Sequence, residues 1–193
     1  SATKTFEKDS TVQAYNKAGS VIQQFTIPSN VKHFEAGTEE GTLRRQAVSM
    51  AINRQNICDK VLNGTGTPAA DFTSPLTPGY SDSLTGSDNL KYNEKKAKEL
   101  WDKANAISPW TADDKLTFAY NADGGHEVIY TAVVNSINNV LGDGVAATNP
   151  YPTFNDFRTA VSDRKVNGAF RSGWQPDYPS AENYLMQNFA SSA

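Results

Sequence analysis

Hydrophobic residues along this chain follow two spacings, one typical of helices and one typical of strands. Apolar positions three and four residues apart predict amphipathic helices at 39–54, 93–104, 127–141, 153–163 and 180–189. Short runs of β-branched and aromatic residues predict strands at 21–27, 115–121, 144–148 and 166–171. Residues 31–34 form a further short run that could pair with 21–27 across Pro28. This set of elements is typical of an α/β protein.

The second half of the chain alternates between strands and helices. The alternation predicts a mixed sheet with helices packed on its faces. In the helix at 153–163, Phe154, Phe157 and Val161 form the predicted buried side. Ligand sites in such sheets tend to lie just beyond the ends of strands. The segment that follows the strand at 166–171 is therefore a candidate binding loop.

The length of 193 residues fits one domain with a substantial core. We therefore predict a single α/β lobe over residues 1–193, in which residues 1–40 form a leading segment that carries strands. Residues 63–91 are rich in Gly, Pro, Ser, Thr and Asp without clear periodicity, and they predict a long loop. We expect this loop to be ordered, because Phe72, Leu76 and Tyr80 are able to anchor it.

Composition and charge exclude several classes of partner. The net charge is -3 at pH 7 and the isoelectric point is near 5.4, which gives no electrostatic basis for binding nucleic acid or an anionic membrane. The chain has no run of ~20 apolar residues and no signal-peptide pattern in residues 1–10. Cys58 is the only cysteine, so no internal disulfide can form, and its helical context predicts a small buried side chain.

The chain shows little sign of enzyme chemistry. His33 and His126 are the only histidines, and neither belongs to an HxxxH-type metal motif. His126 follows Asp123-Gly124-Gly125, where a polar residue at or near a helix start is the ordinary explanation. No Gly-x-Ser-x-Gly nucleophile motif occurs, and the Gly-rich segment at 63–67 lacks the lysine of a phosphate-binding loop. We therefore expect no catalytic residue, no metal and no cofactor.

The segment Arg171-Ser172-Gly173-Trp174-Gln175-Pro176-Asp177-Tyr178-Pro179 has the composition of a receptor for a positively charged group. Asp177 can accept charge-assisted hydrogen bonds, and the aromatic faces of Trp174 and Tyr178 favour a cation and exclude water. Two prolines stiffen the loop. A loop of this composition can also be purely structural, since aromatic and proline residues often cap a core and Asp beside Pro favours a turn.

Four motifs in order resemble the extracytoplasmic solute-binding proteins that feed peptide ABC transporters, family 5. Residues 43–57 are similar to the family's RxAxxxAIDR helix, and Asn63-Gly64-Thr65-Gly66-Thr67-Pro68-Ala69 follows where the family has a Gly-rich turn and a proline. Residues 92–100 resemble its YDPEKAKELL helix start. The segment from Arg171 to Pro179 is similar to its ligand-site signature. The chain departs from the family at Asn53, which replaces an aspartate, and at Ser180-Ala181, which replaces Asp-Pro.

The resemblance implies one lobe, similar to domain III of peptide-binding proteins, of a two-lobed periplasmic-binding-protein type II fold. It implies a receptor that binds peptides between its lobes and delivers them to the permease subunits of an ABC importer. Asp177 matches the position that meets a peptide α-ammonium, and Trp174 matches an aromatic wall of the same pocket. Arg171 could pair with a ligand carboxylate, Gly173 would let the backbone approach closely, and Tyr178 completes the expected set.

Several alternatives follow from the same observations. Members of the family also bind oligosaccharides, nickel complexes or other small solutes, and a lobe of an enzyme with catalytic groups elsewhere is a second alternative. We expect a monomer located outside the cytoplasm, either in a periplasm or attached to the outer face of the cytoplasmic membrane through a lipid anchor outside these residues. The missing first lobe is expected if the chain is an excised piece of a longer protein.

Overall fold

Four strands form one mixed sheet in the order β1-β4-β2-β3 in the computed structural model, which describes residues 9–13, 15 and 17–190. The two central strands, β4 (Ala169–Arg171) and β2 (Leu116–Asn121), run parallel, with Phe118 opposite Ala169. β3 (Ala146–Tyr151) pairs parallel to β2, whereas β1 (Phe25–Thr26) pairs antiparallel to β4. The mixed sheet predicted from the alternation is therefore confirmed.

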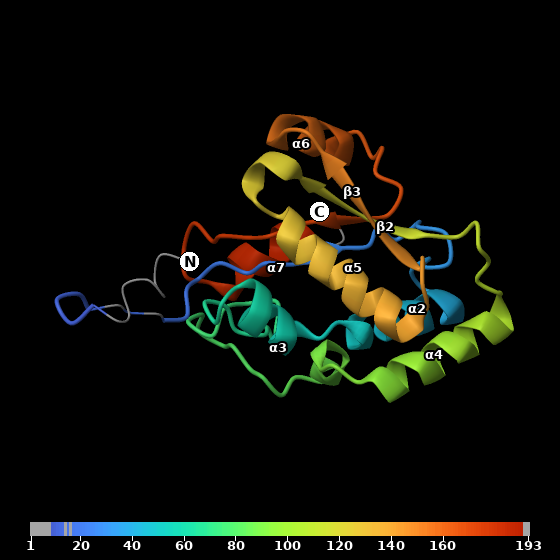
Figure 1. Ribbon diagram of the computed structural model, residues 1–193, viewed down its shortest axis with the longest axis horizontal. Helices are drawn as coiled ribbons and strands as arrows, with labels where there is room; N and C mark the ends of the chain where they lie inside the picture. The colour runs from blue at the N-terminus through green and yellow to red at the C-terminus, as the bar shows by residue number, and fades with distance from the viewer. Residues whose placement is uncertain (1–8, 14, 16, 191–193) are drawn as a thin grey trace.

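Helices cover both faces of this sheet in successive layers (Figure 1). α6 (Phe154–Ser162) lies on one face, and α5 (Glu127–Leu141) lies on the other. α2 (Glu39–Ala51) and α4 (Glu94–Ile107) pack against each other and against α5, so they form a layer beyond it. The main core fills the space between the sheet, α5, α2 and α4, and a smaller core lies under α6.

Most helix starts agree with the sequence because a polar side chain caps them. Thr38, Asn93, Thr153 and Ser180 each accept a hydrogen bond from an amide in the first turn, at the starts of α2, α4, α6 and α7 (Ala181–Phe189). Such a cap satisfies one amide that the helix itself leaves unpaired. α5 ends at Leu141 before Gly142, as predicted. The predicted apolar side of α4 is also confirmed, because Ala97, Leu100, Trp101 and Ala104 are buried.

The predicted strand at 31–34 is wrong. These residues form turns, and Phe34 is fully buried in the core. The guanidinium of Arg45 holds the turn, since it donates to the carbonyl oxygens of Ile27, Pro28 and Phe34. These side-chain hydrogen bonds replace the backbone pairing that the apolar pattern suggested.

The predicted helix at 39–54 is interrupted. α2 ends at Ala51, and Asn53 caps a new turn, α3 (Arg54–Asn56), by accepting from the Asn56 amide at 2.9 Å. A π-helical turn, η1 (Ile57–Val61), follows and buries Cys58 as predicted. Arg54 donates to the carbonyl oxygens of Ser49 and Leu90, and burial lowers its pKa to about 10. The arginines of this motif therefore stabilise the fold.

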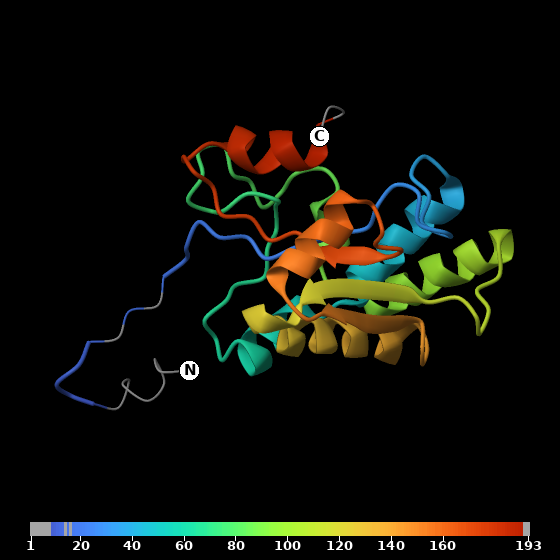
Figure 2. The same cartoon turned by 90° about the horizontal axis from the view of Figure 1, so that it is seen from above.

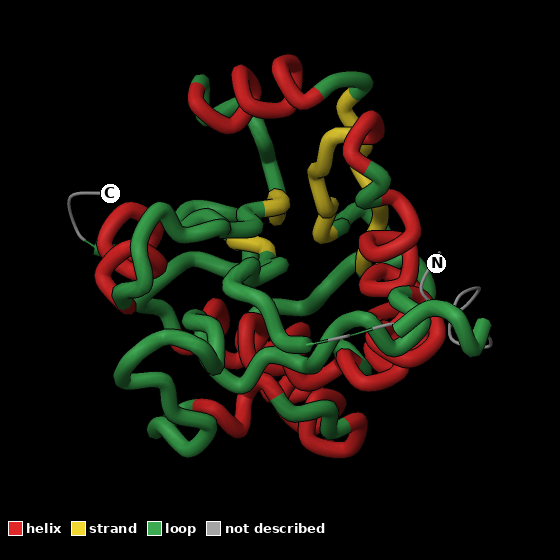
Figure 3. Tube along the Cα trace, turned by 90° about the vertical axis from the view of Figure 1, so that its left-hand side faces the viewer, coloured by secondary structure: helices red, strands yellow, loops and turns green. Residues whose placement is uncertain are grey.

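Residues 63–91 consist of turns and loop with one 3-10 turn, η2 (Ser87–Leu90), and Figure 3 shows how much of the described chain lies in loops. Its anchors differ in part from the prediction, because Thr73, Ser74 and Thr77 are buried whereas Leu76 is 62% exposed. Ser74 donates to the carbonyl oxygen of Gly19 at 2.8 Å. The hydroxyl of Ser74 thus anchors the part of the loop where the sequence suggested Leu76.

Two aromatic residues that the sequence analysis singled out, Phe72 and Phe154, are largely exposed to solvent. Phe72 is 44% exposed but packs edge-on against Phe189 of α7, with ring centroids 5.1 Å apart. This contact joins the loop to α7, which lies on the opposite side of the molecule from α5 (Figure 2). Phe154, predicted on the buried side of α6, is 48% exposed, whereas Phe157 and Ala160 lie in the smaller core and Val161 packs against it.

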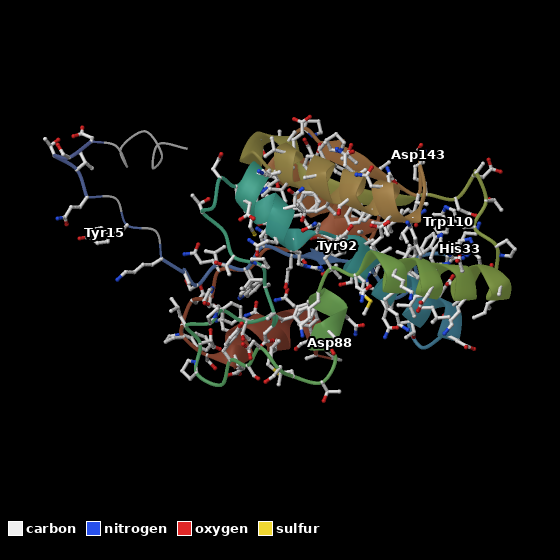
Figure 4. The ribbon with its side chains drawn as sticks, turned by 60° about the horizontal axis from the view of Figure 1, so that its bottom comes forward. Tyr15, His33, Asp88, Tyr92, Trp110 and Asp143 are labelled. Atoms are coloured by element: carbon white, nitrogen blue, oxygen red, sulfur yellow. The ribbon has the colours of Figure 1, made fainter. Side chains whose placement is uncertain are left out.

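A buried cluster of charged side chains joins the start of α2 to the loop after α4. His33 lies between two carboxylates, with Nδ1 2.7 Å from Glu40 Oε1 and Nε2 3.2 Å from Asp114 Oδ1. Arg44 is fully buried and donates to Glu40 Oε1 at 2.8 Å. Figure 4 shows His33 beside Trp110, and their ring centroids are 5.3 Å apart. His33 therefore has a structural role that the sequence did not indicate.

The stability of this cluster is expected to depend on pH through Asp114. Hydrogen bonds from Lys32 and from the backbone and side chain of Thr111 hold the pKa of Asp114 well below its usual range. A carboxylate with a lowered pKa in the folded state stabilises the protein above its unfolded-state pKa of about 3.9, and this contribution is lost as the pH falls. Asp114→Asn is therefore expected to lower the free energy of unfolding at pH 7, and the difference from the wild type is expected to shrink below about pH 4.

Urea unfolding between pH 7 and pH 3 measures this difference. Asp113→Asn is the matched control, because Asp113 is exposed and forms no ion pair within the described residues. If the difference in the free energy of unfolding between the wild type and Asp114→Asn stayed constant down to pH 3, Asp114 would not be the source of the pH dependence.

Candidate functional site

The candidate site is the loop that leaves the carboxyl end of β4. After Arg171 the chain stays extended and pairs antiparallel with the segment before β1. Ile22 and Trp174 exchange both backbone hydrogen bonds, at 2.9 and 2.8 Å, and the Ser172 amide donates to Gln24 O at 3.0 Å. The neighbouring strand, β2, ends at Asn121, so the loop continues beyond it.

This pairing leaves one edge of the loop open. Because Ser172 and Trp174 face residues 22–24, the alternate residues Gly173 and Gln175 direct their backbone groups the other way. Among the residues that the structure describes, the N–H and C=O groups of Gly173 and Gln175 form no backbone hydrogen bond. The open edge lies past the end of β2, where open α/β sheets bind their ligands.

Asn183 of α7 fixes the shape of the loop. Its Oδ1 accepts a hydrogen bond from Trp174 Nε1 at 2.8 Å and another from the Asp177 amide at 3.3 Å. Asn183 is 1% exposed, so its position is set by the packing of α7. The sequence analysis missed this residue, although a polar side chain on the buried face of a predicted helix is a signal for such a contact.

The structure brings Trp174 and Asp177 together and leaves the Asp177 side chain available. Asp177 is exposed, and its carboxylate has no hydrogen bond or ion pair within the described part of the chain. Trp174 is half-buried with its indole N–H turned toward Asn183. Tyr178 is 48% exposed, and its ring makes no aromatic contact with Trp174 in the described residues. Asp177 is thus flanked in sequence by two aromatic residues that do not form a closed cage.

Arg171 provides positive charge near the start of the same loop, and His126 lies close enough to feel that charge. Both side chains are half-buried, and Arg171 Nε has no hydrogen-bond partner in the described structure. Burial lowers the pKa of His126, the charge of Arg171 lowers it further, and Asp123 acts in the opposite direction. His126 occupies the N-cap position of α5 without forming a capping hydrogen bond. The interaction between His126 and Arg171 is a feature that the sequence analysis missed.

Asp123 positions the turn that carries His126. Its carboxylate accepts from Asn121 Nδ2 at 2.7 Å and from the Phe154 amide at 3.0 Å. Gly125 follows with a φ of +69°, a left-handed conformation that favours glycine. The end of β2, the start of α5 and the start of α6 are therefore held together at this edge of the sheet.

Gly173 has a packing role in addition to its open backbone. A Cβ at this position would lie 3.0 Å from Gln23 Oε1 and 3.4 Å from Ile22 O. Glycine therefore leaves room for the Gln23 side chain across the strand pair. The close approach of a ligand backbone, which the sequence predicted for Gly173, stays a prediction.

The described residues contain no group of three or more His, Cys, Asp or Glu side chains arranged to hold a metal ion. In the same part of the chain, no helix combines the length and apolar character needed to cross a membrane.

The loop after β4 thus combines an exposed carboxylate, a half-buried arginine and an open backbone edge beyond the end of the sheet. The family of bacterial extracellular solute-binding proteins, family 5 Middle, matches residues 2–193. The chain therefore belongs to this family, which confirms the resemblance drawn from the four motifs and agrees with the expected location outside the cytoplasm.

Individual relatives are peptide-binding proteins by name. The periplasmic oligopeptide-binding protein OppA of Salmonella typhimurium is 31% identical over 146 residues, which cover 73% of this chain and 25% of OppA. The dipeptide-binding protein DppE of Bacillus subtilis is 27% identical over 146 residues, which cover 73% of this chain and 26% of DppE. The chain thus spans about a quarter of the length of these relatives.

Solved structures share the fold. The pheromone receptor PrgZ, described with its mode of peptide binding, superposes with a TM-score of 0.77 at 16% identity, covering 98% of this chain and 36% of PrgZ. The binding protein DppA of Helicobacter pylori, solved with the peptide STSA, gives a TM-score of 0.74 at 19% identity over 94% of this chain and 32% of DppA. These structures confirm the predicted fold class, one α/β lobe of the periplasmic binding proteins.

Proposed function

We propose that the protein is the solute-binding component of an ABC importer and that it binds peptides between this lobe and a second lobe. The open backbone edge at Gly173 and Gln175 is the observation that carries the proposal. An extended peptide can add to such an edge through its own N–H and C=O groups. Oligosaccharides and metal complexes lack this regular pattern of backbone groups, so the edge favours a peptide ligand.

The charges around the edge suggest a direction for the peptide. Asp177 lies at one end and is available for the α-ammonium group, and Arg171 with His126 lies at the other end and is available for a carboxylate. A peptide bound in this direction would run antiparallel to residues 171–177. Termini and backbone are shared by all peptides, so side-chain selectivity would come from other contacts. Trp174, fixed by Asn183, would form one wall of the ammonium site.

The remaining roles follow from the same proposal. The receptor would act outside the cytoplasm as a monomer and deliver its ligand to membrane permease subunits. Any lipid anchor would lie outside residues 1–193. The protein would perform no chemistry on the peptide, because the proposed site contains groups that bind termini and backbone.

A thermal-shift screen of the whole receptor against short peptides, oligosaccharides and nickel salts tests the ligand class. A ligand at 100 times its dissociation constant adds about 2.7 kcal/mol to the free energy of unfolding, which gives a measurable shift. We expect a shift with peptides whose termini are free. A shift with sugars or nickel alone would replace the proposal with another branch of the family.

Backbone recognition predicts that ester-for-amide replacement weakens binding. An ester in place of a peptide amide removes one N–H group. Where that N–H pairs with the C=O of Gly173 or of Gln175, the ester removes a hydrogen bond worth about 0.5–1.5 kcal/mol. We therefore expect a loss of affinity of about 2- to 12-fold at one or two positions of a bound peptide, measured by calorimetry. Esters at the other positions serve as controls, and an equal effect at every position would contradict strand addition.

Carboxylate binding predicts a change in the titration of His126. A peptide carboxylate beside Arg171 would offset the positive charge that now lowers the His126 pKa. We expect the His126 pKa to rise when a peptide with a free carboxyl terminus binds, as measured by NMR titration of the imidazole. The same peptide with an amidated carboxyl terminus is the control, and an equal rise with both peptides would place the carboxylate elsewhere.

A further inference from the structure

Asn183 carries a hydrogen-bond donor that the binding loop leaves unused. Its Oδ1 accepts from Trp174 Nε1 at 2.8 Å and from the Asp177 amide at 3.3 Å, so both lone pairs of this oxygen are occupied. The same two donors fix the orientation of the carboxamide, because each of them requires an oxygen as its acceptor. The two hydrogens on Nδ2 remain, and Nδ2 is buried without a hydrogen-bond partner in the described residues.

The burial of Nδ2 limits what can accept its hydrogen bond. Asn183 is 1% exposed, and Nδ2 itself is closed to solvent. A water molecule or a chain segment outside residues 1–193 therefore cannot reach this atom unless the loop moves first. Buried donors of this kind are rare in folded proteins, because an unmade hydrogen bond costs free energy. The acceptor is therefore expected among the groups that the loop already holds close to Asn183.

The Asp177 carboxylate is a group that fits this description. Its own backbone amide already meets Asn183 Oδ1, and a carboxamide presents its oxygen and its nitrogen side by side. One carboxamide can therefore accept from the N–H of Asp177 and donate to the carboxylate of the same residue after that side chain rotates. The carboxylate is exposed and makes no hydrogen bond or ion pair within the described residues. Each of the two groups thus lacks the partner that the other can supply.

Helix α7 holds Asn183 in place for this contact. The neighbouring Tyr184 is 2% exposed, and its hydroxyl donates to Ser20 O at 2.6 Å. Ser20 lies two residues before Ile22, which exchanges both backbone hydrogen bonds with Trp174. The helix is therefore tied to both segments of this pairing. The carboxamide of Asn183 is a fixed donor beside a carboxylate that is able to rotate, which is the arrangement that orients a charged group in a binding site.

We propose that Asn183 is a positioning residue of the ammonium site and that its Nδ2 donates to the Asp177 carboxylate when a peptide binds. The proposal rests on the proposed function, in which this carboxylate meets the peptide α-ammonium. Closure of two lobes takes the carboxylate out of water, and a buried carboxylate needs hydrogen bonds in addition to its cation. Asn183 would supply one of them and would turn the carboxylate toward the peptide terminus without touching the peptide itself.

The affinities of one peptide with a free or an acetylated amino terminus test the proposal in the whole receptor. Asn183→Leu keeps the approximate size of the side chain and removes the Nδ2 donor. We expect calorimetry to show that the ratio of the free-peptide affinity to the acetylated-peptide affinity falls about 10-fold, as for the loss of a hydrogen bond to a charged group. The ratio reports on the carboxylate, because a change in loop shape alone would weaken both peptides.

Tyr184→Phe is the matched control on the same helix. It removes one buried hydrogen bond of α7, the bond to Ser20 O, and leaves Asn183 in place. Any loss of affinity that it causes should be equal for the free and the acetylated peptide. If Tyr184→Phe lowered the ratio as much as Asn183→Leu does, damage to α7 would explain both variants and the positioning role would be wrong.

The protons on Asn183 Nδ2 give a second measurement, on the wild-type receptor. We expect one of their two NMR signals to move downfield when the free peptide binds, because that proton enters a hydrogen bond with a carboxylate. Asp177→Ala removes the acceptor and should abolish the movement at saturating peptide. Signals that do not move in the wild type, or that move equally in Asp177→Ala, would overturn the proposal, and this holds even if Asn183→Leu does not fold.

Asp177→Asn separates this proposal from the proposed function. If Asp177→Asn lowers the affinity ratio and Asn183→Leu does not, the ammonium site stands and the positioning role is wrong. If Asp177→Asn leaves the ratio unchanged, Asp177 is not the ammonium partner and both proposals fail. If each variant lowers the ratio and the double variant lowers it no further than Asp177→Asn alone, the two residues act as one unit and both proposals are supported.

Discussion

Replacing Asp177 by asparagine in the whole receptor is expected to weaken the binding of peptides with a free amino terminus by about 100-fold or more. Closure of two lobes over the ligand would remove the ammonium group from water, and an ammonium group without its anion costs about 3–5 kcal/mol in such a place. The asparagine side chain keeps the size and one acceptor oxygen of aspartate but carries no charge. Calorimetric titration with one peptide, free or N-acetylated, measures the effect.

The acetylated peptide is the control for the charge interaction. Its terminal amide carries no positive charge, so its affinity should change little between the wild type and Asp177→Asn. Asp143→Asn is the matched protein control, because Asp143 is also exposed and lies in the turn between α5 and β3 (Figure 4). An equal loss of affinity for both forms of the peptide would rule out Asp177 as the ammonium partner.

Replacing Arg44 by methionine is expected to lower the free energy of unfolding by about 3–5 kcal/mol. The guanidinium of Arg44 is fully buried, lies 4.4 Å from the ring centroid of Trp101 and 5.1 Å from that of Trp110, and donates to Ser108 O at 2.6 Å. Methionine would fill part of the space but would remove the arginine partner of Glu40, which would keep only the contact with His33 Nδ1. Urea unfolding followed by tryptophan fluorescence measures the change.

Two further variants separate the effect of losing the Arg44–Glu40 ion pair from the general effect of replacing an arginine. Arg158→Met changes an exposed arginine of α6 and is expected to alter the free energy of unfolding by less than about 0.5 kcal/mol. The double variant Arg44→Met with Glu40→Gln is expected to lose less than the sum of the two single losses, because it leaves no unpaired carboxylate. Strict additivity would show that the ion pair between Arg44 and Glu40 contributes nothing.

The local pattern was sufficient to place most helices and to give the alternation of strands and helices along the second half of the chain. The amphipathic stripes of α4 and α5 and the caps at Thr38, Asn93, Thr153 and Ser180 depend on residues within a few positions of each other. Such interactions are visible in a sequence because their partners are close along the chain. The lone cysteine was also predicted correctly as a buried side chain.

The incorrect predictions for residues 31–34 and for Leu76 share a cause, which is a contact between residues that are distant in the sequence. Residues 31–34 have an apolar pattern, but Arg45 binds their carbonyl groups from a neighbouring helix and keeps them in turns. Leu76 seemed suited to anchor its loop, yet the hydroxyl of Ser74 bonds to Gly19, which is 55 residues away in the chain. A contact between distant residues has no periodicity along the sequence, so no local pattern could predict it.

The sequence alone determined the fold class and the family of this protein, and it identified the loop from Arg171 to Tyr178 as the candidate site. These conclusions depend on periodicity and on motifs, which are properties of the chain itself. Only the tertiary structure decided that Asn183 fixes Trp174, that Arg171 acts on His126, and that Gly173 and Gln175 form an open edge. Each of these features joins residues from different elements, and their separation in space is set by the packing of the sheet with its helices.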